Sequence, residues 1–513
     1  MAIQYQTFPI EFKGGLISNL SPLQQGVNAL GSATVLENFE PSTSGGYSKI
    51  KGFAKFDTTV LPGSGDVFLT KVLCLNFVLA ARADGGVTKY DESQGSGWTL
   101  KGTAASLGQR VRFVDVVLGG KKKTVLVDGV NFPAIYNDTD DNFTFLSASN
   151  SPDIAASSDV EFFKNHFFFA SGANLVFSAP FDETDFSAAN GAGSLSLGSE
   201  IEGLKVFRDQ LIIFTKRSIH KLVGNSISDF NLSPITLDIG CTAKETIQEV
   251  GGDIMYLSSD GIRLLSATDR IGDFGLAVAS APIKKDTEYF LKIANNFSSL
   301  VIREKAQYRV FGYNAATPSD LSPGLLATKF SAQGADSIAW ATLRGMKVNV
   351  SDSLITGNSE TIVFGNDSGY VYKMEFGSNF DSENIRCVYE SPYMPIQDPQ
   401  IRKTFYRVTT YLEPTATLNL NINLSYDFAG QGKGTTIDPP TSTLVSTAGA
   451  VSLYGAPTSI YNTSKYGSFA DRIYETFVLG GGKTVSLRYE DDSTNPTFKL
   501  DTAVLEFRTN ERQ

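Results

Sequence analysis

The sequence predicts an all-β protein built around a β-propeller of six or seven blades, with seven favoured. The first observation is a turn signal that recurs about every 44 residues between two short apolar segments. The second is a composition rich in glycine (47), phenylalanine (36) and tyrosine (20), which favours strands over long helices. A fixed period of roughly 40–45 residues built from short strands is typical of propeller blades.

The turn signals are tight turns, several of them of the Asp-Gly type. Glycine adopts a positive φ without steric cost and aspartate tolerates it, so this pair suits a hairpin. Seven signals follow one another at spacings of 44, 43, 45, 44, 45 and about 62 residues. They are Asp84-Gly85, Asp128-Gly129, Ser171-Gly172, Lys216-Arg217, Asp260-Gly261, Lys305-Ala306 and Asp367 to Gly369. Residues 66–73, 110–119 and 200–207 add upstream strands, as blades of three or four strands require.

Composition divides the chain into three parts. Residues 1–60 are rich in Gly, Ser, Asn and Pro and predict an extended N-terminal arm for assembly, with a helical turn near Ala33–Asn38. Residues 61–392 form the propeller, with an inserted loop near 313–340 that delays the seventh turn. Alternation from Leu418 to Tyr426 indicates half-buried antiparallel strands, so residues 393–513 are expected to form a C-terminal β-sandwich-like domain.

Charge and cysteine content limit the classes of function. A net charge of −10 argues against tight binding of nucleic acid, because such binding comes mainly from Lys and Arg that neutralise phosphates. Three distant cysteines, Cys74, Cys241 and Cys387, give no disulfide framework and are expected to be buried thiols. The N-terminus lacks a signal-peptide pattern and no apolar stretch reaches membrane-spanning length, so we expect a soluble protein made in a cytoplasm.

We expect no catalytic, cofactor-binding or metal-binding residues. The phosphate-loop lookalike Gly480 to Thr484 has Phe477 where a P-loop needs glycine, and a strand pattern follows it, so the glycines are expected to turn a hairpin. His166 and His220 lie in strand patterns with no metal-ligand spacing.

Other charged and aromatic segments have structural explanations. The aspartates of the turn signals are explained by their turns, and Ser258 to Gly261 resembles only part of a sialidase Asp-box. Lys121 to Lys123 is a solvated hairpin tip or, alternatively, a contact with an acidic neighbour or DNA phosphates. The aromatic run Phe162–Phe169 is a strand buried on both faces, or two short strands separated at Lys164-Asn165.

Several segments resemble a known family. The resemblance extends over about residues 8–270, and its motifs are made of glycine, apolar residues and turns. The motifs are "FKGGL" (Phe12–Leu16), "LENFEP" with Asn38, Gly45-Gly46, "IKGF" (Ile50–Phe53), Ser199–Gly224 and Gly251–Ala267. They are similar to segments of the tail nozzle (tail tubular protein B-like) and packaged-DNA stabilisation proteins of short-tailed bacteriophages.

The resemblance implies a non-enzymatic structural protein of the virion tail. It implies a homohexameric ring around the DNA exit channel that helps to retain the packaged genome and conducts it during ejection. Its implied partners are other copies of the chain, a head-to-tail adaptor protein, tail fibre or tailspike proteins, and double-stranded DNA in transit, without stable membrane insertion. An acidic protein suits such a conduit because it repels phosphates.

Two other classes of function stay open at this point. One is a propeller-type glycan-binding or glycoside-hydrolysing protein, for which paired carboxylates should converge at one face of the disc. The other is a propeller scaffold for protein partners, since a propeller alone is compatible with many functions.

Overall fold

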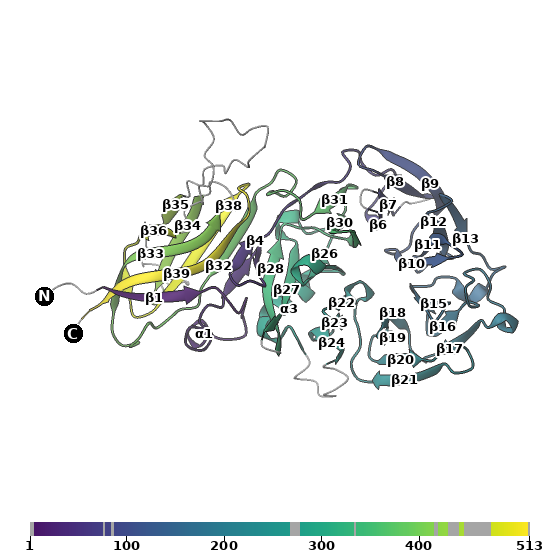
Figure 1. The fold of residues 1–513 in the computed structure, drawn as a ribbon, viewed down its shortest axis with the longest axis horizontal. Coiled ribbons are helices and arrows are strands. Elements are labelled where there is room, and N and C mark those ends of the chain that lie inside the picture. Colours follow the sequence, from purple (N-terminus) through teal and green to yellow (C-terminus); the bar gives the residue numbers. More distant parts are fainter. Residues whose placement is uncertain are drawn as a thin grey trace.

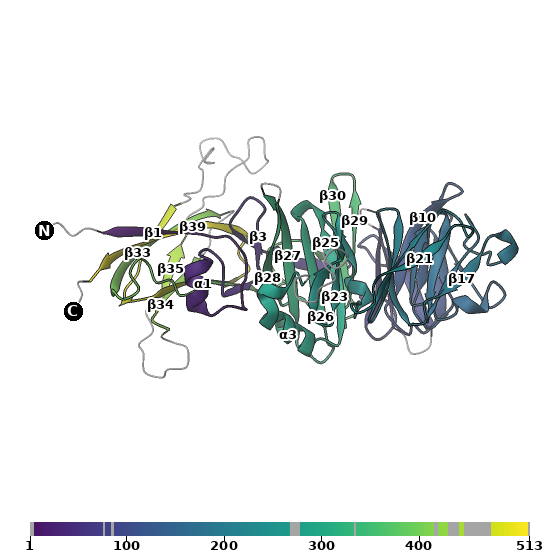
Figure 2. The ribbon, with the colours of Figure 1, turned by 90° about the horizontal axis from the view of Figure 1, so that it is seen from below.

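A computed structural model shows two β-rich bodies side by side, a propeller disc and a β-sandwich (Figure 1). It describes residues 5–74, 77–83, 87–266, 278–332, 335–414, 419–428, 441–445 and 473–510. Seen along its edge in Figure 2, the disc continues into the sandwich without a narrow linker. The all-β class, the propeller and the C-terminal sandwich are therefore confirmed.

Six sheets form separate blades of antiparallel strands. β6–β9 are Val67–Cys74, Phe77–Arg82, Val87–Ser93 and Trp98–Ala105, and β10–β13 are Arg112–Leu118, Lys121–Val127, Ala134–Asn137 and Asn142–Phe145. β14–β17 are Asp159–Phe163, His166–Ser171, Asn174–Phe177 and Gly193–Ser196, and β18–β21 are Ile201–Phe207, Gln210–Thr215, Ile219–Val223 and Asn231–Thr236. β22–β24 are Gln248–Val250, Asp253–Ser258 and Gly261–Leu264. β29–β31 are Val350–Thr356, Ser359–Gly365 and Val371–Met374, completed by β5 (Phe53–Lys55).

A nine-stranded sheet joins the propeller to the sandwich. Its order is β25-β26-β27-β28-β2-β32-β38-β34-β35, so four propeller strands continue into strands of the C-terminal domain. β25–β28 are Asn296–Ile302, Gln307–Tyr313, Pro323–Ala332 and Ala335–Arg344, and β2 is Val35–Glu37. β32, β38, β34 and β35 are Ile385–Glu390, Val485–Ser493, Asn419–Tyr426 and Ser442–Val445.

A seven-stranded sheet forms the other layer of the sandwich. β33 and β39 are its central strands and pair antiparallel, and β1 and β4 pair with β39. The strands are β1 (Gln6–Glu11), β3 (Phe39–Pro41), β4 (Tyr47–Lys49), β33 (Lys403–Pro414), β36 (Ile473–Phe477), β37 (Gly481–Gly482) and β39 (Phe498–Thr509). The two layers bury Leu420, Ile422 and Leu424 from one sheet and Val408 and Leu505 from the other.

Helices are few and short in the described ranges. α1 (Pro22–Asn28) and α3 (Lys284–Ile293) flank the joint between the two bodies (Figure 1). The single-turn 3₁₀ helices are η1 (Pro152–Ile154), η2 (Ala188–Asn190), η3 (Lys244–Thr246), η4 (Ala281–Ile283), η5 (Arg303–Lys305) and η6 (Ser319–Leu321). The helical turn predicted at Ala33–Asn38 is wrong: that segment contains β2, and the helix begins 11 residues earlier, at Pro22.

The sequence favoured seven blades, whereas the structure has six blades that each form a sheet of their own. Six turn signals lie in described residues and all connect paired strands, whereas Asp84-Gly85 lies outside the described residues. Lys305-Ala306 connects β25 to β26, the first two strands of its sheet, while the other five described signals connect a second strand to a third. The segment with this signal is not a separate blade, because its last strand, β28, pairs onward with β2.

The predicted inserted loop near 313–340 is also wrong. Most of this range belongs to β27 and β28, which pair along ten residues each from Pro323↔Arg344 to Ala332↔Ala335. Because these strands contain Ser, Ala and Gly, their sequences lack a clear alternation of apolar and polar residues. Leu325, Leu326 and Trp340 are nevertheless buried. The late seventh turn therefore results from a long hairpin and from the different position of the sixth signal within its sheet.

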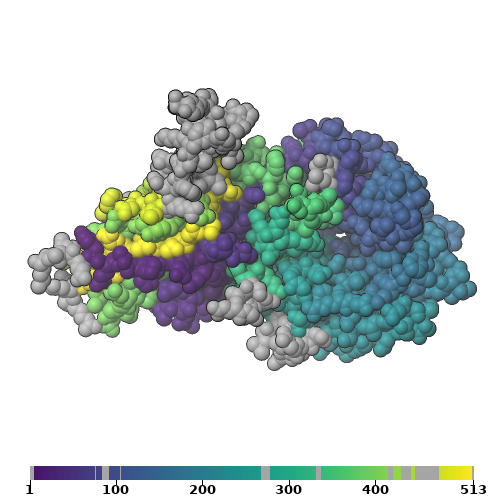
Figure 3. Space-filling view, in the orientation of Figure 1, coloured from purple at the N-terminus to yellow at the C-terminus, as the bar shows by residue number. Residues whose placement is uncertain are grey.

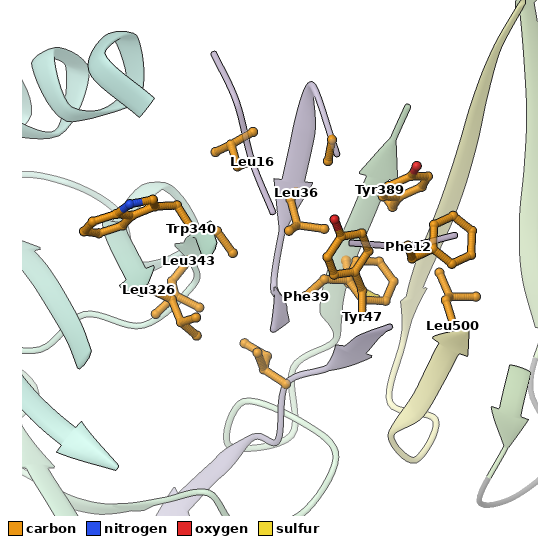
Figure 4. Close-up of a cluster of buried hydrophobic side chains, with 14 of the residues drawn as sticks. Phe12, Leu16, Leu36, Phe39, Tyr47, Leu326, Trp340, Leu343, Tyr389 and Leu500 are labelled. Carbon is orange, nitrogen blue, oxygen red and sulfur yellow. The ribbon is translucent and has the colours of Figure 1, made fainter. Parts of the chain in front are cut away.

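The N-terminal segment is extended as predicted, but it pairs within its own chain. β1, β3 and β4 belong to the sandwich, β2 to the shared sheet and β5 to the last separate blade. Figure 3 shows this purple segment running from the sandwich towards the disc. Its apolar side chains enter the largest core cluster together with Tyr389, Leu500 and Trp340 (Figure 4). The segment expected to serve assembly is therefore largely buried in its own chain.

Asn38 connects the two bodies at the end of β2. Its φ of 53° is in the left-handed region, where asparagine is among the tolerated residues. Its Nδ2 donates to the carbonyl oxygens of Arg344 (3.0 Å) and Arg386 (2.8 Å), and its Oδ1 accepts from the Arg344 N–H (2.9 Å). One side chain thus bridges the last residue of β28 and a residue of β32.

A buried charge cluster lies beside the same joint. Arg309, whose side chain is fully buried, contacts Glu40 (3.0 Å) and Glu375 (2.8 Å), and Lys305 lies 2.6 Å from each of the same two carboxylates. Burial alone would raise the pKa of Glu375, but Arg309 and Lys305 outweigh it and hold the pKa below its ordinary value of 4.5. The cluster joins β3 of the N-terminal segment to two propeller sheets.

We predict that Asn38→Ala destabilises the fold by about 2–4 kcal/mol, because it removes three hydrogen bonds and leaves a Cβ at positive φ. Asn38→Gly should be less destabilising than Asn38→Ala by about 1 kcal/mol, because glycine adopts this φ freely. Urea unfolding followed by circular dichroism measures both. Equal stabilities of the two variants would contradict a role for the backbone conformation.

The Glu375 cluster predicts a loss of stability in acid. A carboxyl whose folded pKa is below its unfolded value stabilises the fold above about pH 4.5, and this contribution is lost as the pH falls through the folded pKa. Glu375→Gln should therefore destabilise the protein by about 3–5 kcal/mol at pH 7 and by less as the pH falls. Unfolding midpoints at pH 7 and pH 3 test this, with exposed Glu304→Gln as the matched control.

Candidate functional site

The charged side chains that could form a site on the disc lie mostly near the propeller axis. The first strands of the blades lie nearest the centre of the disc, whereas β9, β13, β17 and β21 lie at the rim (Figure 1). Each first strand is apolar with isolated charges, such as Lys71 in β6, Asp115 in β10 and Lys205 in β18. Because neighbouring first strands contact one another around the disc, these charges meet.

Every carboxylate of this axial cluster has a basic partner. Lys71 Nζ lies 2.8 Å from Asp115 Oδ2 and 3.6 Å from Asp352 Oδ2. The other pairs are Arg110 Nη2 to Glu245 Oε1 (3.1 Å), Arg112 Nε to Asp159 Oδ1 (3.1 Å) and Lys205 Nζ to Glu161 Oε1 (3.2 Å). The pairs connect different blades, so they hold the disc together at its centre.

Burial determines how these groups titrate. It raises the pKa of Glu161, although Lys205 opposes the shift, and it lowers the pKa of Lys244, whose ammonium group donates to the Ser158 carbonyl oxygen at 2.8 Å. Burial also acts to lower the pKa of Lys71, but Asp352 and Asp115 outweigh it and the pKa is raised. A raised carboxyl pKa is a property of general acids, and burial raises the pKa of both Glu161 and Asp352.

The space beside Glu161 is small. The cavity beside Glu161 has a volume of about 170 Å³, below the roughly 300–1,000 Å³ of ligand pockets. It is also lined by Thr70 and Asn349, each 1% exposed, whose Oγ1 and Oδ1 atoms have no partner in the described chain. Such a polar cavity suits ordered water. Ion pairs between blades and a small polar cavity therefore lie at the axis beside Glu161.

The histidines singled out in the sequence have structural surroundings. His166 is buried, its Nδ1 lies 2.7 Å from the Ser178 carbonyl oxygen, and its ring packs against Phe177 and Phe230. His220 is half-buried, and burial lowers its pKa. In the ranges that the structure describes, no group of three His, Cys, Asp or Glu side chains is placed to hold a metal ion.

The Lys121 to Lys123 run is neutralised by acids of its own chain. Lys121 pairs with Asp140, Lys122 lies 3.2 Å from Asp138 and Lys123 pairs with Glu183. The acidic neighbour considered as one interpretation is thus intramolecular. These pairs leave little positive charge at this hairpin to attract phosphates.

The aspartates of the described turn signals stabilise their own surroundings. Asp128 Oδ1 accepts from the N–H groups of Val130 (3.1 Å) and Asn131 (2.8 Å). Asp260 forms an ion pair with Arg263, and Asp367 lies 2.6 Å from Lys347. They do not form a common acidic site.

The glycine run at 480–482 passes between the two layers of the sandwich. β36 and β37 pair with β33, whereas β38 pairs with β32 and β34 of the other sheet, so the predicted hairpin is wrong. A Cβ on Gly480 would lie 2.3 Å from the Tyr426 ring, which explains the glycine there. The strand predicted after Thr484 is confirmed as β38, and no helix follows to make a P-loop.

Two further sequence predictions have clear outcomes. The aromatic run forms two strands, β14 and β15, joined at Lys164 and Asn165, which both have positive φ. Cys241 and Cys387 are buried as predicted, but Cys74 is exposed at the end of β6.

The sequence interpretation missed the axial cluster. The available signal was one or two charged residues in the middle of an apolar first strand, repeated from blade to blade, as in "FLTKVL" and "RFVDVVL".

No helix in the described part of the chain is both long and apolar enough to cross a membrane.

Comparison with known proteins reveals only distant structural likeness. No protein-family model matches the chain, and no curated protein matches it. The extracellular domain of a one-component system of B. thetaiotaomicron is similar with a TM-score of 0.40 and 11% identity, over 77% of this chain and 52% of that one. An ancestral GH74 enzyme gives 0.40 and 10%, over 69% and 52%.

A third similar structure is PorZ, a surface component of the type-IX secretion system of Porphyromonas gingivalis. Its TM-score is 0.39 and its identity 10%, over 77% of this chain and 59% of PorZ. The chain thus spans little more than half the length of these three proteins. Likeness at this level gives no information about function.

We predict that Lys71→Met destabilises the protein by about 3–5 kcal/mol, because it leaves Asp115 and Asp352 without their shared cation. Lys216→Met, at an exposed ion pair with 65% of the lysine side chain accessible, should change stability by less than about 0.5 kcal/mol. Chemical denaturation of both variants measures the difference. Equal effects would show that the axial pairs do not hold the blades together.

Proposed function

We propose that this chain is a structural subunit of a short-tailed phage virion, the tail nozzle, and that six copies form a ring around the DNA exit channel. The observation that carries the proposal is the joint that fuses the propeller and the sandwich through one sheet. Such a joint makes one stiff building block with two distinct ends, which suits a permanent assembly.

Several N-terminal residues that resemble the nozzle family pack closely in and around this joint. Gly15 of the "FKGGL" motif packs so closely that a Cβ there would lie 2.7 Å from the Trp340 backbone nitrogen. A Cβ on Gly46 would lie 2.5 Å from the Leu500 carbonyl oxygen, and one on Gly52 would lie 1.8 Å from that of Asn379. Asn38 supplies the hydrogen bonds described above. The motifs therefore have a physical role in this architecture, which supports the resemblance.

The ion pairs at the propeller axis bear on where DNA would pass in such a ring. A cavity of about 170 Å³ beside the Lys205–Glu161 ion pair does not hold a duplex. The channel would therefore lie between copies of the chain, lined by their outer surfaces. A net charge of −10 per chain limits adhesion of phosphates to that lining.

Because the carboxylates at the propeller axis are ion-paired with basic side chains, they argue against the glycoside-hydrolase alternative there. A hydrolase needs two carboxyl groups across a sugar-sized space, whereas Glu161, Asp115 and Asp352 are each held by a lysine beside a small cavity.

We predict that the purified chain, alone or with a head-to-tail adaptor protein, forms a particle of six copies with a central opening. Native mass spectrometry gives the number of copies, and negative-stain imaging shows the six-fold ring. Phage particles assembled without the protein should lose packaged DNA, measured as nuclease-sensitive genome. A chain that stays monomeric with the adaptor and is absent from purified virions would refute the proposal.

A further inference from the structure

We infer that a groove at the edge of the first two separate blades binds a neutral carbohydrate, a function beyond the proposed nozzle role. The groove has a volume of about 620 Å³, within the range of ligand pockets. It lies between the β6–β7 end of one blade, the turn from β8 to β9, and the β12–β13 turn of the next blade. The turn between Ser93 and Trp98 forms one wall.

Trp98 offers the groove an aromatic surface in a fixed position. Its indole Nε1 donates to the Thr59 carbonyl oxygen at 3.1 Å, and the half-buried ring packs against the core cluster between the first and last separate blades. Trp98 also lines the groove, as does Phe77. A ring held in this way presents apolar area at low entropic cost, which suits the C–H face of a sugar.

The polar groups of the groove are oriented by ion pairs. Lys101 Nζ lies 3.1 Å from Glu92 Oε2 and 2.7 Å from Asp141 Oδ2, and the Tyr136 hydroxyl donates to Asp141 Oδ1 at 3.0 Å. An ionised carboxylate accepts about four hydrogen bonds and an ammonium donates three. Counted over the described residues, Glu92 and Lys101 thus retain capacity to bind hydroxyl groups, and exposed Gln94 adds both a donor and an acceptor.

Charge balance favours a neutral ligand. The acids of the lining are Glu92, Asp138 and Asp141, and each is paired with Lys101 or with Lys122, which lies 3.2 Å from Asp138. Three carboxylates with two ammonium groups repel phosphates and other anions. Each acid already has a cation, so a basic peptide gains less than it would from unpaired acids. A polyhydroxylated neutral ligand fits what remains.

A buried carboxylate fixes the wall that holds Trp98. Asp57, 1% exposed, accepts hydrogen bonds from the N–H groups of Thr59 (2.8 Å) and Gly97 (2.7 Å), and from the Ser93 hydroxyl. These bonds tie the turn from β8 to β9 to the start of the propeller chain. The groove is therefore formed before a ligand arrives, which lowers the entropic cost of binding.

The chain supplies two reporters for this groove. It has two tryptophans, and Trp340 is 1% exposed, so a ligand-dependent change in tryptophan emission reports on Trp98. Of its three cysteines, Cys74 is exposed and lines the groove, whereas Cys241 and Cys387 are buried. The rate at which a thiol reagent labels the native protein therefore reports on Cys74.

The experiment titrates the full-length protein with maltotriose, cellotriose and chitotriose, and with tetralysine as a cationic probe. At least one trisaccharide should change the Trp98 emission saturably and slow the labelling of Cys74. Glu92→Gln should weaken that binding roughly tenfold or more, because hydrogen bonds to charged groups contribute about 1.5–3 kcal/mol. Glu200→Gln, an exposed acid on another blade, is the matched control and should bind like the wild type.

Three results would overturn the inference. One is that no trisaccharide changes either reporter in a protein whose circular dichroism is native. Another is a response that is the same in Glu92→Gln and Glu200→Gln. The third is saturable binding of tetralysine in place of the sugars, which would make the groove a site for basic peptides. None of these results depends on whether the chain forms a ring.

Discussion

The insertion of β2 between β28 and β32 is the constraint on which the rest of the structure depends. This strand of three residues pairs parallel with the propeller strand β28 and antiparallel with β32 of the sandwich. Without it, the nine-stranded sheet would separate into a propeller sheet and a sandwich sheet. The strand occupies this position because Glu37 forms ion pairs with Arg344 and Arg386, while Asn38 holds the backbone of the same two residues. Hydrogen bonds, ion pairs and the backbone conformation of Asn38 therefore all stabilise the joint.

Buried charge has the same use at the joint and at the propeller axis. In both places a basic side chain lies between two carboxylates that come from different sheets: Arg309 between Glu40 and Glu375, and Lys71 between Asp115 and Asp352. Desolvation makes such clusters poor sources of net stability compared with apolar packing. They are, however, costly to leave incomplete, so they disfavour any arrangement that separates the sheets. The ion pairs at the axis are thus explained by blade alignment.

The sequence predicted the features that depend on residues close together in the chain. Hairpins such as those at Asp128-Gly129 and Ser171-Gly172 depend on a few adjacent residues, and both are present. What it missed depends on distant partners. The separate-blade count changed because β28 pairs with a strand about 300 residues earlier in the chain, and no alternation within β27 or β28 reveals that. The groove beside Trp98 combines residues of two blades and the segment around Asp57, so its lining was not visible in any single motif.

The N-terminal segment changes how the proposed ring must be assembled. A Cβ on Gly26 would lie 2.0 Å from the Tyr393 carbonyl oxygen, and one on Gly31 would lie 2.1 Å from that of Glu11, so this segment is among the most closely packed parts of the chain. Because it is committed to its own subunit, it cannot also be a loose arm that reaches a neighbour. A closed ring needs two different complementary surfaces on each subunit. These must come from side chains still exposed on the folded body, such as Val27 on α1 (59% exposed) and Phe477 at the end of β36 (78%). Assembly by rigid bodies is therefore the mechanism to which this architecture is suited.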